Sequence, residues 1–365
     1  MKSSQIHQVN DSIGDNRYKI IRFIGEGGMQ QVYEAQDLVL EKSVALKVPK
    51  NSSALKRFRR SAVVSAQINH PNVAKTLDYL EDGEISYLIE ELIDGDNLND
   101  GFLGKVKFVD PYLAAKVFHY LAKGVAASHH VGVFHRDLKP DNIMIVGGFN
   151  LDQIKITDFG IAKLAEAEFT SVLGNENDTL ASSTAVGAIP YMAPEMFLDA
   201  KSAGLPADIW ALGAMMYELI SGKKPFGSGH IAIAKILDQI NPGAIKPEQP
   251  SQIVQNSQVK PLGDALYQII LSCMNSDVDS RVTADELVTK CEKLSYPIAP
   301  RQMGTVTAKH PQYNWGNIST DFGGKFFFHF DSVFGEAPIV GSRVCFSAFS
   351  GQPLDRAHPV IVLRN

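Results

Sequence analysis

Eight consecutive residues carry most of the recognisable chemistry of this chain: His135-Arg136-Asp137-Leu138-Lys139-Pro140-Asp141-Asn142. The tripeptide Asp158-Phe159-Gly160 follows after 15 intervening residues. Carboxylate and amide oxygens are the ligands that a hard cation such as Mg²⁺ prefers, and a lysine among them supplies positive charge. Such a set can hold a metal ion and neutralise the charge on a phosphate group. Asp-Phe-Gly alone occurs by chance in many proteins, but the two runs at this spacing do not.

The two runs match the H-R-D-x-x-x-x-N and D-F-G motifs of protein kinases. From residue 18 to about residue 295 the chain resembles bacterial Ser/Thr protein kinases, because the other landmarks of that family follow in order. These landmarks are the glycine turn at 25–28, Val44-Ala45-Leu46-Lys47, Ala193-Pro194-Glu195, Asp208-Ile209-Trp210 and Arg281. Small-molecule phosphotransferases share the catalytic logic but lack the last three, which makes them a weaker match. The resemblance also implies that Arg281 pairs with Glu195.

The resemblance implies roles for residues near the chemistry. Asp137 would orient the substrate hydroxyl and accept its proton, Lys139 would place positive charge near the transferring phosphoryl group, and Lys47 would hold the α/β-phosphates of ATP. Asn142 and Asp158 would hold Mg²⁺. The expected nucleotide pocket comprises Ile24, Gly25, Gly27, Gly28, Val32, Ala45, Lys47, Glu90, Glu91, Ile93 and Met144. The expected reaction is transfer of the ATP γ-phosphoryl group to a hydroxyl of a protein substrate.

The segment between Asp158 and Glu195 is rich in hydroxyl side chains. Arg136 precedes Asp137, and in kinases with an arginine at this position an arginine binds a phosphate group on this segment. The candidate phosphorylation sites are Thr170, Ser183 and Thr184. The alternative is an ordinary flexible loop in which hydroxyl residues are common.

The chain departs from the family pattern at several positions. Ser61 stands where the family has the helix glutamate that pairs with the lysine, and Ala188 stands where a threonine bonds the catalytic aspartate and lysine. The third glycine of the phosphate-binding turn is Gln30, which predicts a stiffer loop. These changes leave open an ATP-binding pseudokinase.

Glu90 occupies the position at the back of the ATP pocket where an apolar residue or threonine is usual. Strand alternation puts Glu90 on the same face as Leu88 and Leu92, and an unpaired carboxylate buried there would be costly. We therefore expect Glu90 to pair with Lys47, in place of the carboxylate missing at Ser61. The alternative is a strand register shifted by one residue, which would put Glu90 in solvent.

The composition is that of an ordinary globular protein, with 45% hydrophobic and 21% charged residues. No apolar run reaches the length of a membrane span, the first 16 residues lack the apolar stretch of a signal peptide, and the three cysteines show no metal-ligand spacing. We therefore expect a cytoplasmic protein with reduced thiols and no membrane partner. The net charge of −5 gives no general reason to expect nucleic-acid binding, although residues 301–365 carry six Lys/Arg against four acidic residues.

The pattern of elements predicts an α+β chain. Residues 18–50 read as short strands, 54–68 as a helix, and 76–80 and 85–92 as two more strands. Helices are expected at 111–130, 208–221, 231–240, 261–275 and 284–294. The expected domains are an N-terminal tail (1–17), a bilobal kinase domain (18–295, with lobes 18–93 and 94–295), a linker (296–303) and a small all-β domain (304–365).

Residues 304–365 resemble a cold-shock domain, which is a five-stranded OB barrel. The matching runs are Gly304-Thr305-Val306, Trp315-Gly316-Asn317-Ile318, Gly323 to Phe330, Pro338 to Phe346, and Arg356-Ala357. Cold-shock domains stack single-stranded bases on aromatic side chains, and Trp315, Phe327 and His329 occupy such positions. Two other aromatic positions are lost to Ala308 and Asn317, and an expected basic residue is Tyr313.

The sequence thus predicts a Ser/Thr protein kinase that uses ATP and Mg²⁺, joined to a barrel that binds RNA or single-stranded DNA. One alternative is an inactive ATP-binding scaffold. The other is a nucleic-acid-binding protein whose kinase-like part is a partner surface. The barrel itself has the alternative role of a protein contact, with its aromatic residues partly in the core.

Overall fold

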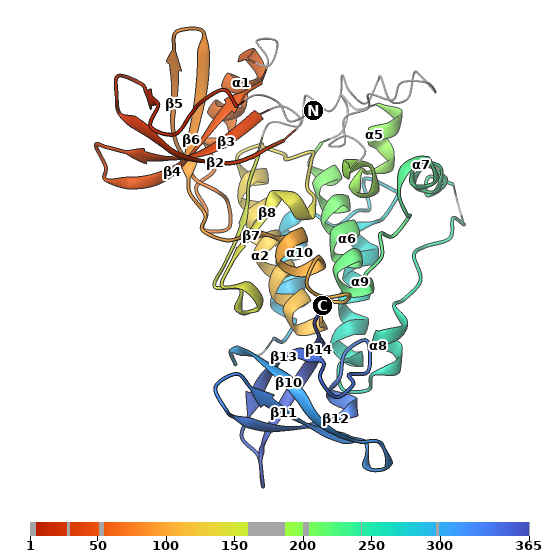
Figure 1. The fold of residues 1–365 in the computed structure, drawn as a ribbon. Helices are drawn as coiled ribbons and strands as arrows, with labels where there is room; N and C mark the ends of the chain where they lie inside the picture. Colours follow the sequence, from red (N-terminus) through yellow and green to blue (C-terminus); the bar gives the residue numbers. More distant parts are fainter. Residues whose placement is uncertain are drawn as a thin grey trace.

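The computed structural model describes residues 5–27, 30–50, 55–159, 187–199, 204–241, 243–296 and 299–364, with the backbone alone at 55–57, 60 and 61. Three bodies follow one another along the chain in Figure 1. A small lobe built on a twisted sheet comes first, a larger helical lobe follows, and a closed barrel lies at the end of the helical lobe remote from the sheet. No helix among the described residues is long and apolar enough to cross a membrane.

In its described residues, the small lobe contains an antiparallel sheet and one helix. The strand order among the described residues is β1-β2-β3-β4-β6-β5. The bounds are β1 Ser12–Ile13, β2 Tyr18–Glu26, β3 Gln30–Asp37, β4 Lys42–Pro49, α1 Leu55–Ser65, β5 Thr76–Asp82 and β6 Ile85–Glu91. Strands β4 and β6 are central in the sheet, so their residues are buried nearly continuously. Their register pairs Ala45 with Glu90 and Lys47 with Leu88.

Residues 5–17 of the segment expected to be an N-terminal tail (1–17) are part of the small lobe, which corrects the prediction for these residues. Strand β1 pairs with β2. His7 is buried, with its ring 3.1 Å from the hydroxyl of Tyr87 and its backbone N–H donating to the hydroxyl of Tyr33. The segment is polar, so no apolar alternation marked it as structured. It is ordered because its polar groups find partners on the sheet.

The large lobe is mainly helical. Its helices are α2 Pro111–His130, α5 Pro194–Leu198, α6 Leu205–Ser221, α7 Gly229–Asp238, α8 Ser251–Gln255, α9 Lys260–Cys273 and α10 Ala284–Glu292. Short strands β7 Asp96–Asn97, β8 Ile143–Val146 and β9 Gln153–Ile156 form a small sheet at the junction with the small lobe. The long predicted helices agree with the structure within a few residues. The single-turn helices α5 and α8 and the π-helical turn Asn99–Leu103 were not predicted, because such short elements have no periodicity to read.

The last part of the described chain is a closed five-stranded barrel with strand order β10-β11-β12-β14-β13. The strands are β10 Arg301–His310, β11 Trp315–Thr320, β12 Lys325–His329, β13 Arg343–Phe349 and β14 Asp355–Val362. Four pairs are antiparallel, whereas β12 and β14 run parallel. Its interior contains Val306, Ile318, Phe328 and Phe346.

The barrel begins three residues earlier than the sequence predicted, so the stretch 296–303 is not all linker. Arg301 pairs with Ser347 at the start of β10. Its backbone N–H donates to Oδ1 of Asn150 at 2.6 Å. The two prolines of this stretch suggested a linker, but the ladder with β13 extends β10 back to Arg301.

The barrel and the large lobe share one hydrophobic core. Phe334, Cys345 and Ile361 of the barrel belong to the same buried cluster as the helices of the large lobe. Arg301 forms a buried ion pair with Asp110 at 2.8 Å, in which the side chains are 4% and 0% exposed. The N–H of Arg364 also donates to the carbonyl of Lys105. The barrel is therefore docked as a structural part of the lobe.

Candidate active site

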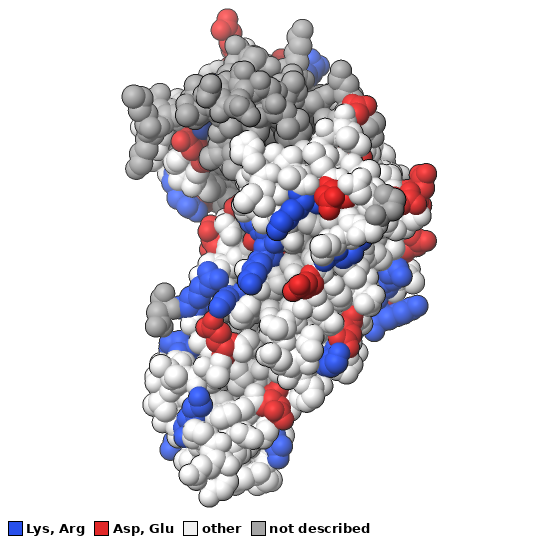
Figure 2. Space-filling view, turned by 90° about the vertical axis from the view of Figure 1, so that its right-hand side faces the viewer, with Lys and Arg blue, Asp and Glu red and all other residues white. Residues whose placement is uncertain are grey.

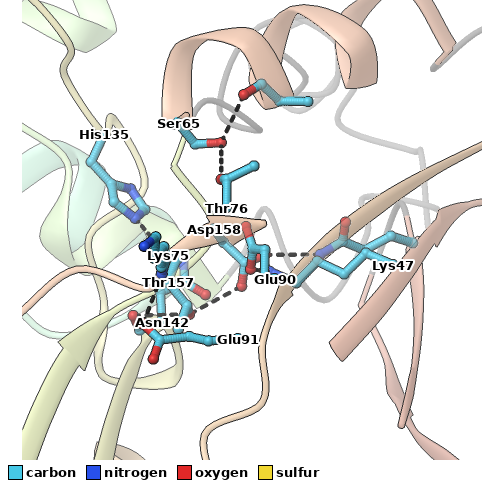
Figure 3. A network of polar contacts seen from close by, with 12 residues as sticks. Lys47, Ser65, Lys75, Thr76, Glu90, Glu91, His135, Asn142, Thr157 and Asp158 are labelled. Atoms are coloured by element: carbon cyan, nitrogen blue, oxygen red, sulfur yellow. Dashed lines mark hydrogen bonds and ion pairs between the residues drawn. The ribbon is translucent and has the colours of Figure 1, made fainter. Parts of the chain in front are cut away.

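Three ionisable side chains meet between the lobes: Lys47 from β4, Glu90 from β6 and Asp158 after β9 (Figure 3). The ammonium group of Lys47 lies 2.5 Å from Oε2 of Glu90 and 2.9 Å from Oδ1 of Asp158. The side chains of Lys47 and Glu90 are 6% and 5% exposed. The lysine is therefore held by two carboxylates in a place that water hardly reaches.

The structure contains the Lys47–Glu90 pair that strand alternation predicted, and the alternative register with Glu90 in solvent is wrong. Residues 51–77, which include all of α1, contain no Asp or Glu. The helix that supplies the lysine's partner in related sequences thus has no carboxylate to offer here. Ser61 lies on α1, and its side chain is outside the described part of the structure.

The pKa values of the three groups follow from burial and mutual attraction. Burial by itself would lower the pKa of Lys47, but Asp158 and Glu90 outweigh it and raise that pKa, so Lys47 stays charged. Burial raises the pKa of Glu90, and the nearby Lys47 only partly offsets this. Burial also opposes ionisation of Asp158, yet Lys47 and Gln30 hold the pKa of that carboxyl below its usual range. Asp158 is therefore the carboxylate best prepared to meet a cation.

The catalytic-loop residues predicted from the motif lie together. The ammonium group of Lys139 donates to Oδ2 of Asp137 at 2.9 Å. The side-chain amide of Asn142 donates to the backbone carbonyl of Asp137 at 2.7 Å and to its Oδ2 at 3.1 Å. Asp137 is thus fixed in orientation by a lysine and an amide from its own loop.

Helix α6 holds this loop in place. Asp208, in the first turn of α6, accepts the backbone N–H groups of His135 and Arg136, both at 2.7 Å, and the Nε2–H of His129 at 3.0 Å. Arg136 has a φ of 66°, a left-handed conformation that a side chain disfavours. The buried carboxylate of Asp208 compensates for that backbone strain by satisfying two adjacent N–H groups.

A second predicted pair also forms. Arg281 donates to both carboxylate oxygens of Glu195, at 2.6 and 3.0 Å. Its guanidinium group lies over the ring of Trp210, 5.2 Å from the centroid. This bidentate contact joins the first turn of α5 to the core of the large lobe.

The oxygen ligands present suit a magnesium ion bound together with a nucleotide. Because the amide N–H₂ of Asn142 faces Asp137, its Oδ1 is left for a cation, and that oxygen accepts no hydrogen bond from the residues that the structure describes. No group of three or more His, Cys, Asp or Glu side chains in the described ranges forms a metal cage. Mg²⁺ is usually held by one or two protein ligands plus phosphates and water, which fits Asn142 and Asp158.

The residues expected to line a nucleotide pocket are spread over both lobes. Ala45 is buried on β4, beside Glu90 in the ladder, and Ile24 on β2 is 43% exposed. The expected residues Val32 on β3, Met144 on β8, Glu91 and Ile93 are half-buried. A Cβ atom placed on Gly25 or Gly27 would meet no atom within 4 Å. The backbone at these two glycines is therefore open to an approaching ligand.

Glu91, at the junction of the lobes, forms structural contacts with two lysine residues. Its carboxylate pairs with Lys155 at 2.7 Å and accepts the backbone N–H of Lys75 at 2.8 Å. Gly28 and the candidate phosphorylation sites Thr170, Ser183 and Thr184 lie outside the described residues. Ala188 is buried at the start of the next described segment.

Gln30 is a site residue whose contact the sequence did not reveal. Its side-chain amide donates to Oδ1 of Asp158 at 2.8 Å and links β3 of the small lobe to the large lobe. The only signal in the sequence was the absence of the usual glycine at this position. That signal indicated a stiffer loop and not the contact with Asp158.

The aromatic residues singled out in the barrel lie on its outer face. The ring centroids of Trp315 and Phe327 are 5.7 Å apart and those of His310 and Trp315 are 3.9 Å apart, with interplanar angles of 35° and 37°. The guanidinium group of Arg356 lies over Phe327, 6.0 Å from the centroid. His329 pairs with Trp315 in the ladder, but its Nδ1 accepts the N–H of Asp331. The sequence had not pointed to His310 or Arg356 as neighbours of these rings.

The order of elements, the buried lysine with its two carboxylates and the catalytic loop together define the class of two-lobed phosphotransferases. Residues 18–291 match the family model described as protein kinase domain. The chain therefore belongs to the protein kinase family. The matched region ends before the barrel begins.

Curated relatives agree with this family. The chain is 34% identical over 248 residues to the serine/threonine-protein kinase PknA of Mycobacterium tuberculosis, covering 65% of this chain and 54% of the relative. It is 31% identical over 285 residues to PrkC of Bacillus subtilis, covering 75% of this chain and 42% of the relative. A probable serine/threonine-protein kinase of Clostridium perfringens is 31% identical over 290 residues, which is 76% of this chain and 38% of that protein. The chain thus spans about half or less of the length of these relatives.

Proposed function

We propose that this chain is a serine/threonine protein kinase that transfers the γ-phosphoryl group of ATP, with Mg²⁺, to hydroxyl groups of proteins. The observation that supports this most is the Glu90–Lys47–Asp158 cluster. It keeps a charged lysine in the cleft although α1 has no carboxylate. Without it, the loss of the helix glutamate would favour an inactive protein.

Each residue has a definite task in this proposal. Lys47 binds the α/β-phosphates, Asn142 and Asp158 hold the metal, and Mg²⁺ when bound neutralises phosphate charge. Asp137 orients the acceptor hydroxyl and takes its proton. Lys139 both fixes Asp137 and places a positive charge beside it. Catalysis of this kind depends mainly on positioning and charge neutralisation.

Phosphate transfer from labelled Mg·ATP to the protein itself and to a generic protein substrate tests this proposal. The matched control is Asp137→Asn, which keeps the size of the side chain and removes the proton acceptor. Incorporation on Ser or Thr in the parent protein, lost in the variant, supports a kinase. Tight binding of Mg·ATP without incorporation in either protein would identify a pseudokinase instead.

We further propose that the barrel is of the OB or cold-shock type and binds single-stranded nucleic acid on its aromatic face. The support is the row His310–Trp315–Phe327–Arg356, whose members lie side by side in tilted ring contacts and a cation–π contact on the outer face. On the face shown in Figure 2, the barrel at the bottom carries separate Lys and Arg side chains among mostly uncharged atoms. Affinity would thus come mainly from stacking, which contributes about 1–3 kcal/mol per base.

Fluorescence anisotropy with short labelled oligonucleotides and the full chain tests the barrel proposal. Binding at low salt that falls about tenfold or more in Trp315→Ala would support it. Phe322→Ala provides a control, because Phe322 is a fully exposed aromatic outside this row. The absence of binding at low salt would rule the proposal out and favour a barrel used for protein contacts.

A further inference from the structure

Gln30 is unusually placed for a residue of a glycine-rich turn. It is the first residue of β3 and is only 8% exposed. Its side chain reaches from the small lobe to Asp158 of the large lobe. A glycine at this position would have no side chain to make that contact.

The two ends of the Gln30 carboxamide are used very differently. Nε2 donates to Oδ1 of Asp158 at 2.8 Å, and the ammonium group of Lys47 donates to the same oxygen at 2.9 Å. Oε1 is buried and has no hydrogen-bond partner among the residues that the structure describes. A buried carbonyl oxygen without a partner is costly, and a turn of the carboxamide would break no hydrogen bond of this oxygen to the described residues.

We propose that Gln30 is a third oxygen ligand of the metal ion that accompanies the nucleotide. On metal loading the carboxamide turns by half a rotation about its last side-chain bond, which exchanges Nε2 for Oε1. Such terminal torsions have broad, roughly two-fold preferences, and the nitrogen and oxygen are nearly the same size. Oε1 then faces the cation together with Asp158, and Nε2 takes the place that Oε1 leaves.

The distances agree with this exchange. After the half-rotation, Oε1 takes the place of Nε2, 2.8 Å from Oδ1 of Asp158. Two neighbouring oxygens on an octahedral Mg²⁺, with bonds of about 2.0–2.1 Å, lie about 2.9 Å apart. Lys47 keeps its own hydrogen bond to Oδ1 of Asp158. The cation approaches this oxygen from the side that the N–H of Gln30 occupies in this structure.

This inference rests on the nucleotide- and metal-binding part of the proposed function and does not require phosphoryl transfer. Its competitor is a simple tether, in which Gln30 only ties the two lobes together until a nucleotide displaces it. The two roles differ in metal dependence. A tether opposes nucleotide binding with or without metal, whereas a ligand contributes only when the metal is present.

The experiment measures the dissociation constant of a non-hydrolysable ATP analogue for the full chain, by calorimetry, in EDTA and at saturating Mg²⁺. The ratio of the two constants gives the metal dependence of binding. Mn²⁺ binding in the presence of the same analogue, followed by electron paramagnetic resonance, provides a second readout. The variants are Gln30→Met, which keeps the volume without an oxygen, and Gln30→Glu, which keeps the oxygen and loses the N–H.

We expect Gln30→Met to lower the metal dependence and the Mn²⁺ affinity about tenfold, the lower end of the effects seen when groups supporting a metal site are removed. Gln30→Glu should keep both at the parent level or above. Gln36→Met, on the same strand and away from Asp158, is the matched control and should change neither. An unchanged ratio in Gln30→Met, with affinity altered equally in EDTA and Mg²⁺, would overturn the inference and identify a tether. A parent protein without metal-dependent nucleotide binding would overturn the proposed function as well.

Discussion

At the scale of single residues, Glu90 takes the place of the helix carboxylate that is missing from α1. Lys47 is held by Glu90 of the neighbouring strand, which the alternation of β6 places inward. The prediction from sequence succeeded here because strand alternation is a strict geometric rule. It failed to anticipate the contact of Gln30, because a side chain that crosses between lobes depends on how those lobes meet.

Replacing Glu90 should weaken Mg·ATP binding far more than replacing Ser61. In Glu90→Gln and Glu90→Leu the ammonium group of Lys47 keeps Asp158 but loses its 2.5 Å partner. We expect the dissociation constant of Mg·ATP to rise about tenfold or more, which corresponds to at least about 1.4 kcal/mol. Ser61→Ala should change it by less than about twofold. Equally small effects of the three variants in calorimetry would show that Glu90 does not support the lysine.

At the scale of elements, the catalytic loop depends on the first turn of α6. Two consecutive backbone N–H groups of the loop donate hydrogen bonds to one buried carboxylate, that of Asp208. The same carboxylate also accepts a hydrogen bond from His129 of α2. Sequence reasoning found α2 and α6 because both are long and apolar on their packed faces. It could place Asp208 only through the resemblance, since nothing in periodicity tells which buried acid meets which loop.

Asp208→Asn should impair turnover while leaving nucleotide binding nearly intact. An amide can accept one of the two N–H groups but presents its own N–H₂ to the other, so the loop and Asp137 shift. Misplacement by about 1 Å can cost on the order of 100-fold in rate. We expect kcat to fall by about that factor and the dissociation constant of Mg·ATP to change less than about threefold.

The matched control for this change is Asp285 on α10, the partner of the next histidine along α2. His130 pairs with Asp285 at 2.9 Å in an exposed contact. Asp285→Asn should therefore leave kcat at the parent value, because an exposed pair contributes little. A similar loss of turnover in both variants would mean that the effect arises from general loosening of the lobe.

At the scale of the whole molecule, the structure differs most from the sequence-based picture in how the barrel is attached. The prediction gave a small all-β domain after a linker, and the strands are present. The shared core and the buried Arg301–Asp110 pair could not be predicted. A local sequence pattern shows that a face is apolar, but it does not show which part of another domain packs against that face. The same reason explains why residues 5–13, with little apolar pattern, were taken as a tail.

Breaking the pair between barrel and lobe should uncouple them. Arg301→Met leaves the carboxylate of Asp110 buried without its cation, which typically costs about 3–5 kcal/mol. Lys107→Met removes the cation of an exposed pair with Glu336 at the same junction and should cost at most about 1 kcal/mol. Thermal unfolding of the two variants should separate these effects clearly.

Thiol reactivity gives an independent measure of docking. Burial raises the pKa of Cys345 and of Cys291, each to about 12, and raises that of Cys273 as well. Below these values the thiols stay protonated, so alkylation should remain slow from pH 8 to pH 10, where an exposed thiol ionises. In Arg301→Met we expect Cys345 to be the first thiol modified. Rapid modification of Cys345 in the parent protein would contradict a docked barrel.

The shared core has a consequence for modularity. Independent domains joined by a linker can be separated there, and each part still folds. Here, removing the barrel near residue 300 would expose apolar side chains of the large lobe to water and leave the carboxylate of Asp110 without its cation. Any segment exchanged for the barrel would have to supply counterparts of Phe334, Cys345 and Ile361, together with a cation for that carboxylate. The end of the family-model match at residue 291 is therefore not a boundary of the folding unit.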